Sequence, residues 1–143
     1  MKLHLAVIAA ITTLLASTFA MAQDLSSPAP EGAQVYIVSP VDGATVGTEV
    51  TVVFGLKGMG IAPAGVEAEH TGHHHLLVDQ AELPAPGLPM GSDVLHFGKG
   101  QTQTTITLEP GEHTLQMVLG NHLHVPHTPA VVSEKITITV KAP

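Results

Sequence analysis

The chain has 143 residues, the length of one domain, with 12 acidic residues, 5 lysines, no arginine and a formal net charge of −7. So few basic residues argue against nucleic-acid binding, which needs clustered lysine and arginine. Because cysteine is absent, disulfide scaffolds, cysteine-ligated zinc sites, iron–sulfur clusters and blue-copper centres are excluded. Histidine is the unusual residue, with 10 copies.

Residues 1–22 have the pattern of a secretory signal peptide. A basic start at Lys2 precedes an apolar run from Leu5 to Leu15, and Ala20-Met21-Ala22 is a small-x-small cleavage site. The apolar run is too short for a transmembrane anchor. We therefore expect cleavage after Ala22 and a periplasmic or secreted protein without a membrane anchor.

The rest of the chain reads as β-structure. Residues 23–33 are rich in Ser, Pro and Gly and predict a flexible leader, followed by one domain over 34–143. Alternating apolar and polar residues between turn signals predict strands at 35–38, 50–57, 73–78, 94–97, 102–108, 113–119 and 135–141. About seven short strands favour an all-β, antiparallel immunoglobulin-like β-sandwich, with a small barrel as the alternative. The Cys…Trp…Cys signature of antibody domains is missing, so only the architecture is implied.

The histidine triplet lies on the third predicted strand. Residues two apart share a face, so His73 and His75 point one way and His74 points toward the core. Two imidazoles at this spacing can converge on one ion, and a His-x-His pair is a common half-site for zinc or copper. Asp79 lies farther along the same face and orients a ligand only if the strand twists favourably.

Further histidines complete the list of candidates. His96 lies near the end of its strand, and His113 lies on an inward face, where it and His74 could meet at one pole of the sandwich. His124 and His127 belong to a loop whose position the sequence does not fix. Each candidate also has a simpler explanation, because a core histidine is often only hydrogen-bonded and a loop histidine only solvated. The candidate metal ligands are His73, His74, His75, His96, His113, His124 and His127.

Methionines are a second type of candidate ligand, because a thioether is a soft ligand for copper. Met117 lies on an apolar strand face, which favours packing. Met59 and Met90 lie in loops beside Gly and Pro, where a thioether has no evident packing role.

Three segments carry a family resemblance. They are TGHHHLLVD at 71–79, LHFGKGQT at 95–102 and PGEHTLQ at 110–116, supported by residues 124–127 and 133–136. Together they resemble a family of small exported bacterial domains of unknown function, over about residues 35–140. The resemblance implies an exported domain without an assigned activity. The seven candidate histidines fall within these motifs, whereas His70 and His122 stand where other residues are usual.

Two functions of different class follow from these observations. The first is an exported protein that binds a transition-metal ion, copper or zinc, for storage, delivery or tolerance. The second is a non-catalytic immunoglobulin-like interaction module for a partner protein of the cell envelope, with structural or pH-sensing histidines. A metal-dependent enzyme is a third alternative, but an enzyme is not expected, because the sequence has neither a Gly-x-Ser-x-Gly elbow nor a His-Glu-x-x-His motif.

Overall fold

A computed structural model describes residues 23–143, so the expected signal peptide at 1–22 lies outside the described residues. The described part is all-β and contains no helix that is long and apolar enough to cross a membrane. Its strands are β1 (Gln34–Ser39), β2 (Thr45–Val46), β3 (Glu49–Lys57), β4 (Gly60–Ile61), β5 (Thr71–Val78), β6 (Leu95–His96), β7 (Gln103–Thr107), β8 (Gly111–Gly120) and β9 (Ile136–Val140).

Seven of these strands match the predicted ones to within two residues at each end. The two strands that the sequence does not predict, β2 and β4, are only two residues long, so they contain no measurable alternation. The predicted all-β sandwich is therefore confirmed.

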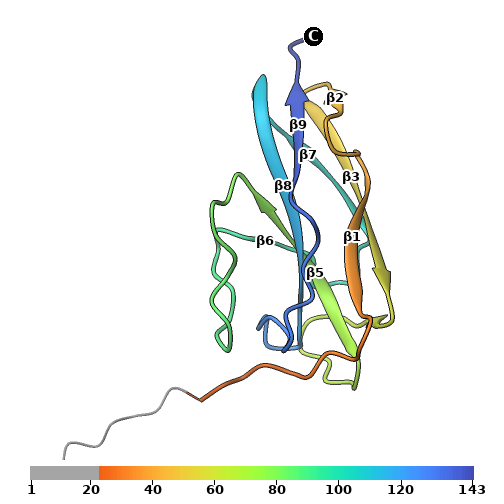
Figure 1. Cartoon of the computed structure of the whole chain (residues 1–143), viewed down its shortest axis with the longest axis vertical. Helices are drawn as coiled ribbons and strands as arrows, with labels where there is room; N and C mark the ends of the chain where they lie inside the picture. Colours follow the sequence, from red (N-terminus) through yellow and green to blue (C-terminus); the bar gives the residue numbers. More distant parts are fainter. Residues whose placement is uncertain (1–22) are drawn as a thin grey trace, which may run out of the picture.

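The strands form two sheets (Figure 1). One sheet has the order β1-β3-β7, and the other has the order β2-β9-β8-β5-β4, with β6 also paired to β5. Most pairs are antiparallel, whereas β2 with β9 and β4 with β5 are parallel. In this arrangement β5 is an interior strand, with β8 on one side and β4 and β6 on the other.

The main hydrophobic core lies between the two sheets. Alternate residues of β3, including Val50, Val52 and Phe54, face Leu76 of β5 and the inward residues of β8 and β9. Leu115, Met117 and Leu119 occupy every second position of β8, and all three are fully buried. The period-two pattern read from the sequence therefore corresponds to the core face.

The outer face of β5 is buried as well. Leu77 points away from the main core and packs with Val94 and Val118 in a second, smaller apolar cluster. Loop residues before β6 and after β8 cover this face, so the six residues from 72 to 77 are all buried. His73 and His75 consequently lie in an interior environment, although they point away from the main core.

Residues 23–33 are ordered against the domain, in contrast to the flexible leader expected from their composition. The Leu25 amide donates to the Gly87 carbonyl, and the Ala29 amide donates to the Thr128 carbonyl. In Figure 1 this segment runs across the end of the sandwich toward β1. Composition reports only local chain preferences, and these long-range backbone hydrogen bonds outweigh them.

Candidate metal centre

The site begins with two histidines of β5. His73 and His75 are two residues apart in regular strand, so both rings project from the outer face of the sheet, with centroids 4.7 Å apart. Their exposed fractions are 0% and 2%. His74 projects to the opposite face, where its ring lies 5.0 Å from that of Phe54 in the main core. The alternation predicted for the triplet is the one observed.

Two further histidines reach the same place from other parts of the chain. In the antiparallel pair of β5 with β6, His96 lies directly across from His75, so both side chains share one face. His124 comes from the loop that follows β8 and folds back over β5. Its ring centroid lies 5.0 Å from that of His73 and 4.4 Å from that of His96.

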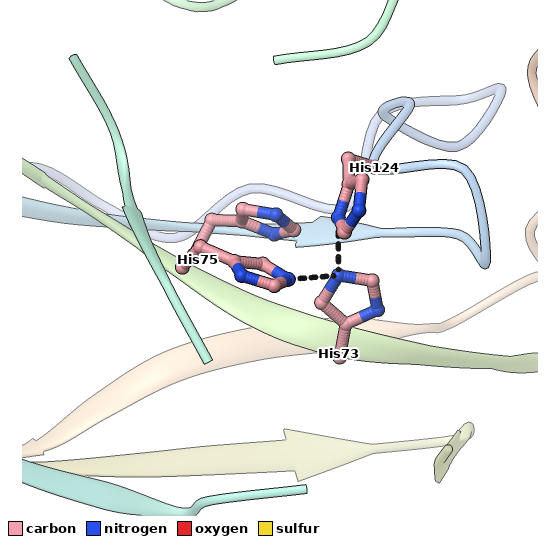
Figure 2. A group of neighbouring side chains, drawn as sticks. His73, His75 and His124 are labelled. Carbon is pink, nitrogen blue, oxygen red and sulfur yellow. Dashed lines mark hydrogen bonds between the residues drawn. The ribbon is translucent and has the colours of Figure 1, made fainter. Parts of the chain in front are cut away.

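Together these residues form a compact four-histidine cluster: His73, His75, His96 and His124. Each offers one ring nitrogen, and the four nitrogens all lie within 4.8 Å of one another. Figure 2 shows the rings of His73, His75 and His124 turned toward a common space. Two nitrogens bound to one tetrahedral zinc ion lie roughly 3.3 Å apart, given Zn–N bonds of about 2.0–2.1 Å. The cluster therefore has the composition and the size of a site that could hold a metal ion.

The hydrogen bonds within the cluster leave several of its ring nitrogens without a partner. Nε2 of His73 lies 3.0 Å from Nδ1 of His124 (Figure 2). The same atom lies 3.1 Å from Nε2 of His96. A neutral ring nitrogen has a single in-plane position, as donor or as acceptor, so it satisfies only one of these contacts. In addition, Nδ1 of His73 and both nitrogens of His75 are buried without a hydrogen-bond partner among the described residues. Each such group costs about 1–3 kcal/mol, and a metal ion, which takes one nitrogen from each ring, would relieve part of this cost.

The environment favours the neutral form of three of the rings, those of His73, His75 and His96. Burial, followed by the neighbouring imidazoles His96 and His124, lowers the pKa of His73 from 6.5 to about 4. Burial, followed by His73 and the same two neighbours, lowers the pKa of His75 to about 3. The pKa of His96 is also lowered, first by burial and then by His124. A neutral imidazole keeps a lone pair on one ring nitrogen, so these rings can coordinate a cation at neutral pH.

The loop that carries His124 is held by Asn121. The amide group of Asn121, which is 1% exposed, donates from Nδ2 to the Leu25 carbonyl and to Ser27 Oγ. Its Oδ1 accepts hydrogen bonds from the backbone amides of Leu123 and Val125. This network fixes a tight turn in which His124 has a φ of 65°. The ordered segment 23–33 therefore contributes directly to the position of a candidate ligand.

Gly120, opposite His73 in the β5–β8 pair, makes room for the cluster. A Cβ atom at this position would lie 2.5 Å from Cε1 of His75 and 2.8 Å from Cε of Met90. Both distances are shorter than van der Waals contact, so a side chain here would displace the ring of His75 or the end of Met90. Strand β8 therefore ends with a glycine at the position where the imidazole ring of His75 packs against its backbone.

The cluster opens to solvent on one side. A shallow depression is lined by His75, Met90, Gly91, Ser92, His96 and His124. His96 is the exposed member of the cluster, and His124 is partly exposed. An ion could therefore enter or leave the cluster through this depression without unfolding of the sandwich. His73 and His75 of β5 lie buried at the inner side of the cluster.

Two other candidate ligands, His74 and His127, lie outside the cluster. The ring of His74 belongs to the main core. His127 is 3% exposed, and its ring nitrogens lie 3.3 Å from the Leu119 carbonyl oxygen and 3.1 Å from that of Thr71. Its nitrogens thus face the backbone of β8 and β5 rather than the other histidines, and it holds the end of the loop against the sheet.

His113 also lies away from the cluster, and it does not meet His74 at a common pole. It pairs with Ile138 near the start of β8, whereas His74 pairs with Leu119 near the end of that strand. Its Nδ1 lies 2.7 Å from Oδ2 of Asp79, and its Nε2 lies 2.8 Å from the Glu109 carbonyl oxygen. The hydrogen bond with Asp79, followed by that with Glu109, raises the pKa of His113.

Asp79 consequently does not orient a ligand of the cluster. Asp79 has a φ of 55° directly after β5, which breaks the alternation that would keep it on the same face as His73 and His75. The carboxylate accepts hydrogen bonds from the Thr114 amide and His113. Burial alone would raise the pKa of Asp79, but these hydrogen bonds lower it.

Comparison with known proteins yields a family but no activity. A family profile described as "Domain of unknown function (DUF4399)" matches residues 52–141. This chain belongs to that family. The match includes all four histidines of the cluster and most of both sheets, which agrees with the resemblance noted from the sequence. Neither the curated proteins nor the solved structures contain a match. No activity can therefore be carried over to this DUF4399 member from a named relative.

The seven candidate ligands predicted from the sequence include all four histidines of the cluster. The sequence does not predict the two residues that support the cluster, Asn121 and Gly120. One signal was present for Asn121, because asparagine commonly bonds its own backbone two residues on and so organises a turn. Gly120 carries no such signal, since its role depends on which side chain lies across the sheet.

Proposed function

We propose that this protein binds one transition-metal ion, copper or zinc, at the four-histidine cluster. The observation that carries the proposal is the convergence of four ring nitrogens within 4.8 Å, two of them from fully buried rings. Imidazole is a preferred ligand of both metals, and neutral rings at this spacing need little rearrangement to coordinate. Buried imidazole nitrogens without partners cost stability, and an ion at the cluster would offset part of that cost.

We further propose that the protein acts outside the cytoplasm in storage, delivery or tolerance of this ion. The signal-peptide pattern at residues 1–22 supports export. The open depression at His96 and His124 supports exchange of the ion with solvent or with another molecule. The proposed function is therefore binding of the metal ion, without a chemical reaction at the site.

Calorimetric titration of the purified, tag-free protein with Cu(II) and with Zn(II) tests the proposal. The expected result is one ion per chain, bound more tightly than about micromolar. The variant His73→Ala/His75→Ala should abolish tight binding. Because these two residues are buried and their loss also affects folding, His96→Ala is a second variant at the exposed edge of the cluster. It should weaken binding while the thermal unfolding of the metal-free protein stays cooperative.

His122→Ala is the matched control. His122 lies in the same loop as His124, but its Nε2 is directed toward Glu67 at 4.0 Å, outside the cluster. This variant should bind as the wild type does. No binding tighter than about micromolar, or equal binding by wild type and His96→Ala, would refute the proposed site. The non-catalytic interaction module would then become the leading explanation.

A further inference from the structure

The described chain has three methionines, and the structure separates their roles. Met117 is completely buried in the main core between the sheets. Met59 is partly buried and packs against the same core. Met90 packs against the smaller apolar cluster on the outer face of β5, and it also lines the depression that exposes His75, His96 and His124 to solvent. Only Met90, among the three, therefore lies where a thioether could approach an ion in the four-histidine cluster.

Two further observations fix Met90 beside the cluster. Its terminal methyl carbon Cε and the Cε1 atom of His75 border the same small space above Gly120, since a Cβ there would touch both. Its backbone amide donates a 2.9 Å hydrogen bond to the carbonyl of His124, so the two ligand-bearing loops are joined. The end of the Met90 side chain thus lies next to one cluster histidine, while its backbone is bound to another.

The chemistry of the donors distinguishes two oxidation states of copper. Imidazole suits Cu(II), whereas a soft thioether favours Cu(I) and adds little for zinc. The protein contains no cysteine, so methionine is its only source of sulfur. A thioether at the open rim of an all-nitrogen cluster would supply the soft ligand that four imidazoles lack.

We propose that the sulfur of Met90 joins histidines of the four-histidine cluster as a ligand for Cu(I), which makes copper the ion that this site selects. This inference rests on the proposed metal-binding function and extends it to the identity and the oxidation state of the ion. The buried histidines hold copper in either state, and Met90 adds stability to the reduced state.

Met90→Leu is the decisive variant. Leucine and methionine are close in volume, so the contacts of Met90 with Leu77, Val94 and Val118 are largely retained while the sulfur is lost. Cu(I) affinity is measured by competition with a chromophoric Cu(I) chelator under anaerobic, reducing conditions, and Zn(II) affinity by calorimetry. Met90→Leu should weaken Cu(I) binding about tenfold more than it weakens Zn(II) binding.

X-ray absorption of the Cu(I)-loaded protein gives an independent readout. A sulfur neighbour of copper should be present in the wild type and absent in Met90→Leu. The control is Met59→Leu, which removes a sulfur that packs against the core, and it should retain both the Cu(I) affinity and the sulfur signal.

The outcomes separate this inference from the function on which it rests. If the wild type binds Cu(I) through nitrogen alone, or if Met90→Leu and Met59→Leu behave alike, the role of Met90 is refuted while metal binding stands. If the wild type binds no metal, or if binding survives the loss of His73 and His75, both proposals are refuted together.

Discussion

Acidification of the metal-free protein should destabilise it, because two buried cluster histidines, His73 and His75, are held neutral in the folded state. The pKa of His73 falls from 6.5 to about 4, and that of His75 to about 3. The unfolded chain therefore binds protons at these positions below pH 6.5, while the folded chain does not until the pH is far lower. The stabilisation is fully present above pH 6.5 and is lost as the pH falls from there toward 4 and 3.

The size of the effect follows from the same pKa values. Between neutral pH and about pH 5, linkage gives a loss on the order of 2 kcal/mol for each of these two buried rings. A domain of this size has a total stability of roughly 5–15 kcal/mol, so the loss is a substantial fraction of it. The midpoint of thermal unfolding should fall by about 10 °C or more over this range.

The assay is thermal unfolding followed by circular dichroism, with a strong chelator present, at a series of pH values from about 7.5 to 5. His75→Leu removes one titrating ring while it keeps apolar volume in the site, so its pH dependence should be distinctly flatter. His122→Ala, outside the cluster, should keep the wild-type slope. A midpoint that stays constant over this range, or an equal slope in His75→Leu, would refute the argument.

Three further predictions test the supports of the site. Gly120→Ala should lower metal affinity and cost about 1–3 kcal/mol, because its Cβ would enter the space of the cluster, whereas Gly47→Ala, which meets nothing within 4 Å, should do neither. Asn121→Ala should weaken metal binding and increase hydrogen exchange in its loop, since four hydrogen bonds are lost. Asp79→Asn should destabilise the protein more at about pH 6 than at about pH 9 in chemical denaturation. The reason is that the raised pKa of His113 provides stability that disappears as the pH rises through that pKa. Equal losses at the two pH values would contradict it.

The local pattern of the sequence determined much of the fold. Alternation located the seven longer or better-marked strands, and it separated His73 and His75 from His74, because the side-chain period of a strand is fixed by its backbone. It also placed Leu115, Met117 and Leu119 on one buried face. Composition by itself excluded whole classes of site, since the chain contains neither cysteine nor arginine.

Tertiary structure decided which histidines meet. Nothing local brings His96 across from His75, because that depends on the register of β6 with β5. Nor does composition indicate that His124 enters the cluster while His127 bonds to backbone carbonyls. That choice depends on the turn held by Asn121, and so on an N-terminal segment almost a hundred residues away in sequence. The sequence supplied the candidate ligand types and their strand faces, while long-range pairing brought together four of the seven candidates, since contacts between distant segments are set by packing and not by local periodicity.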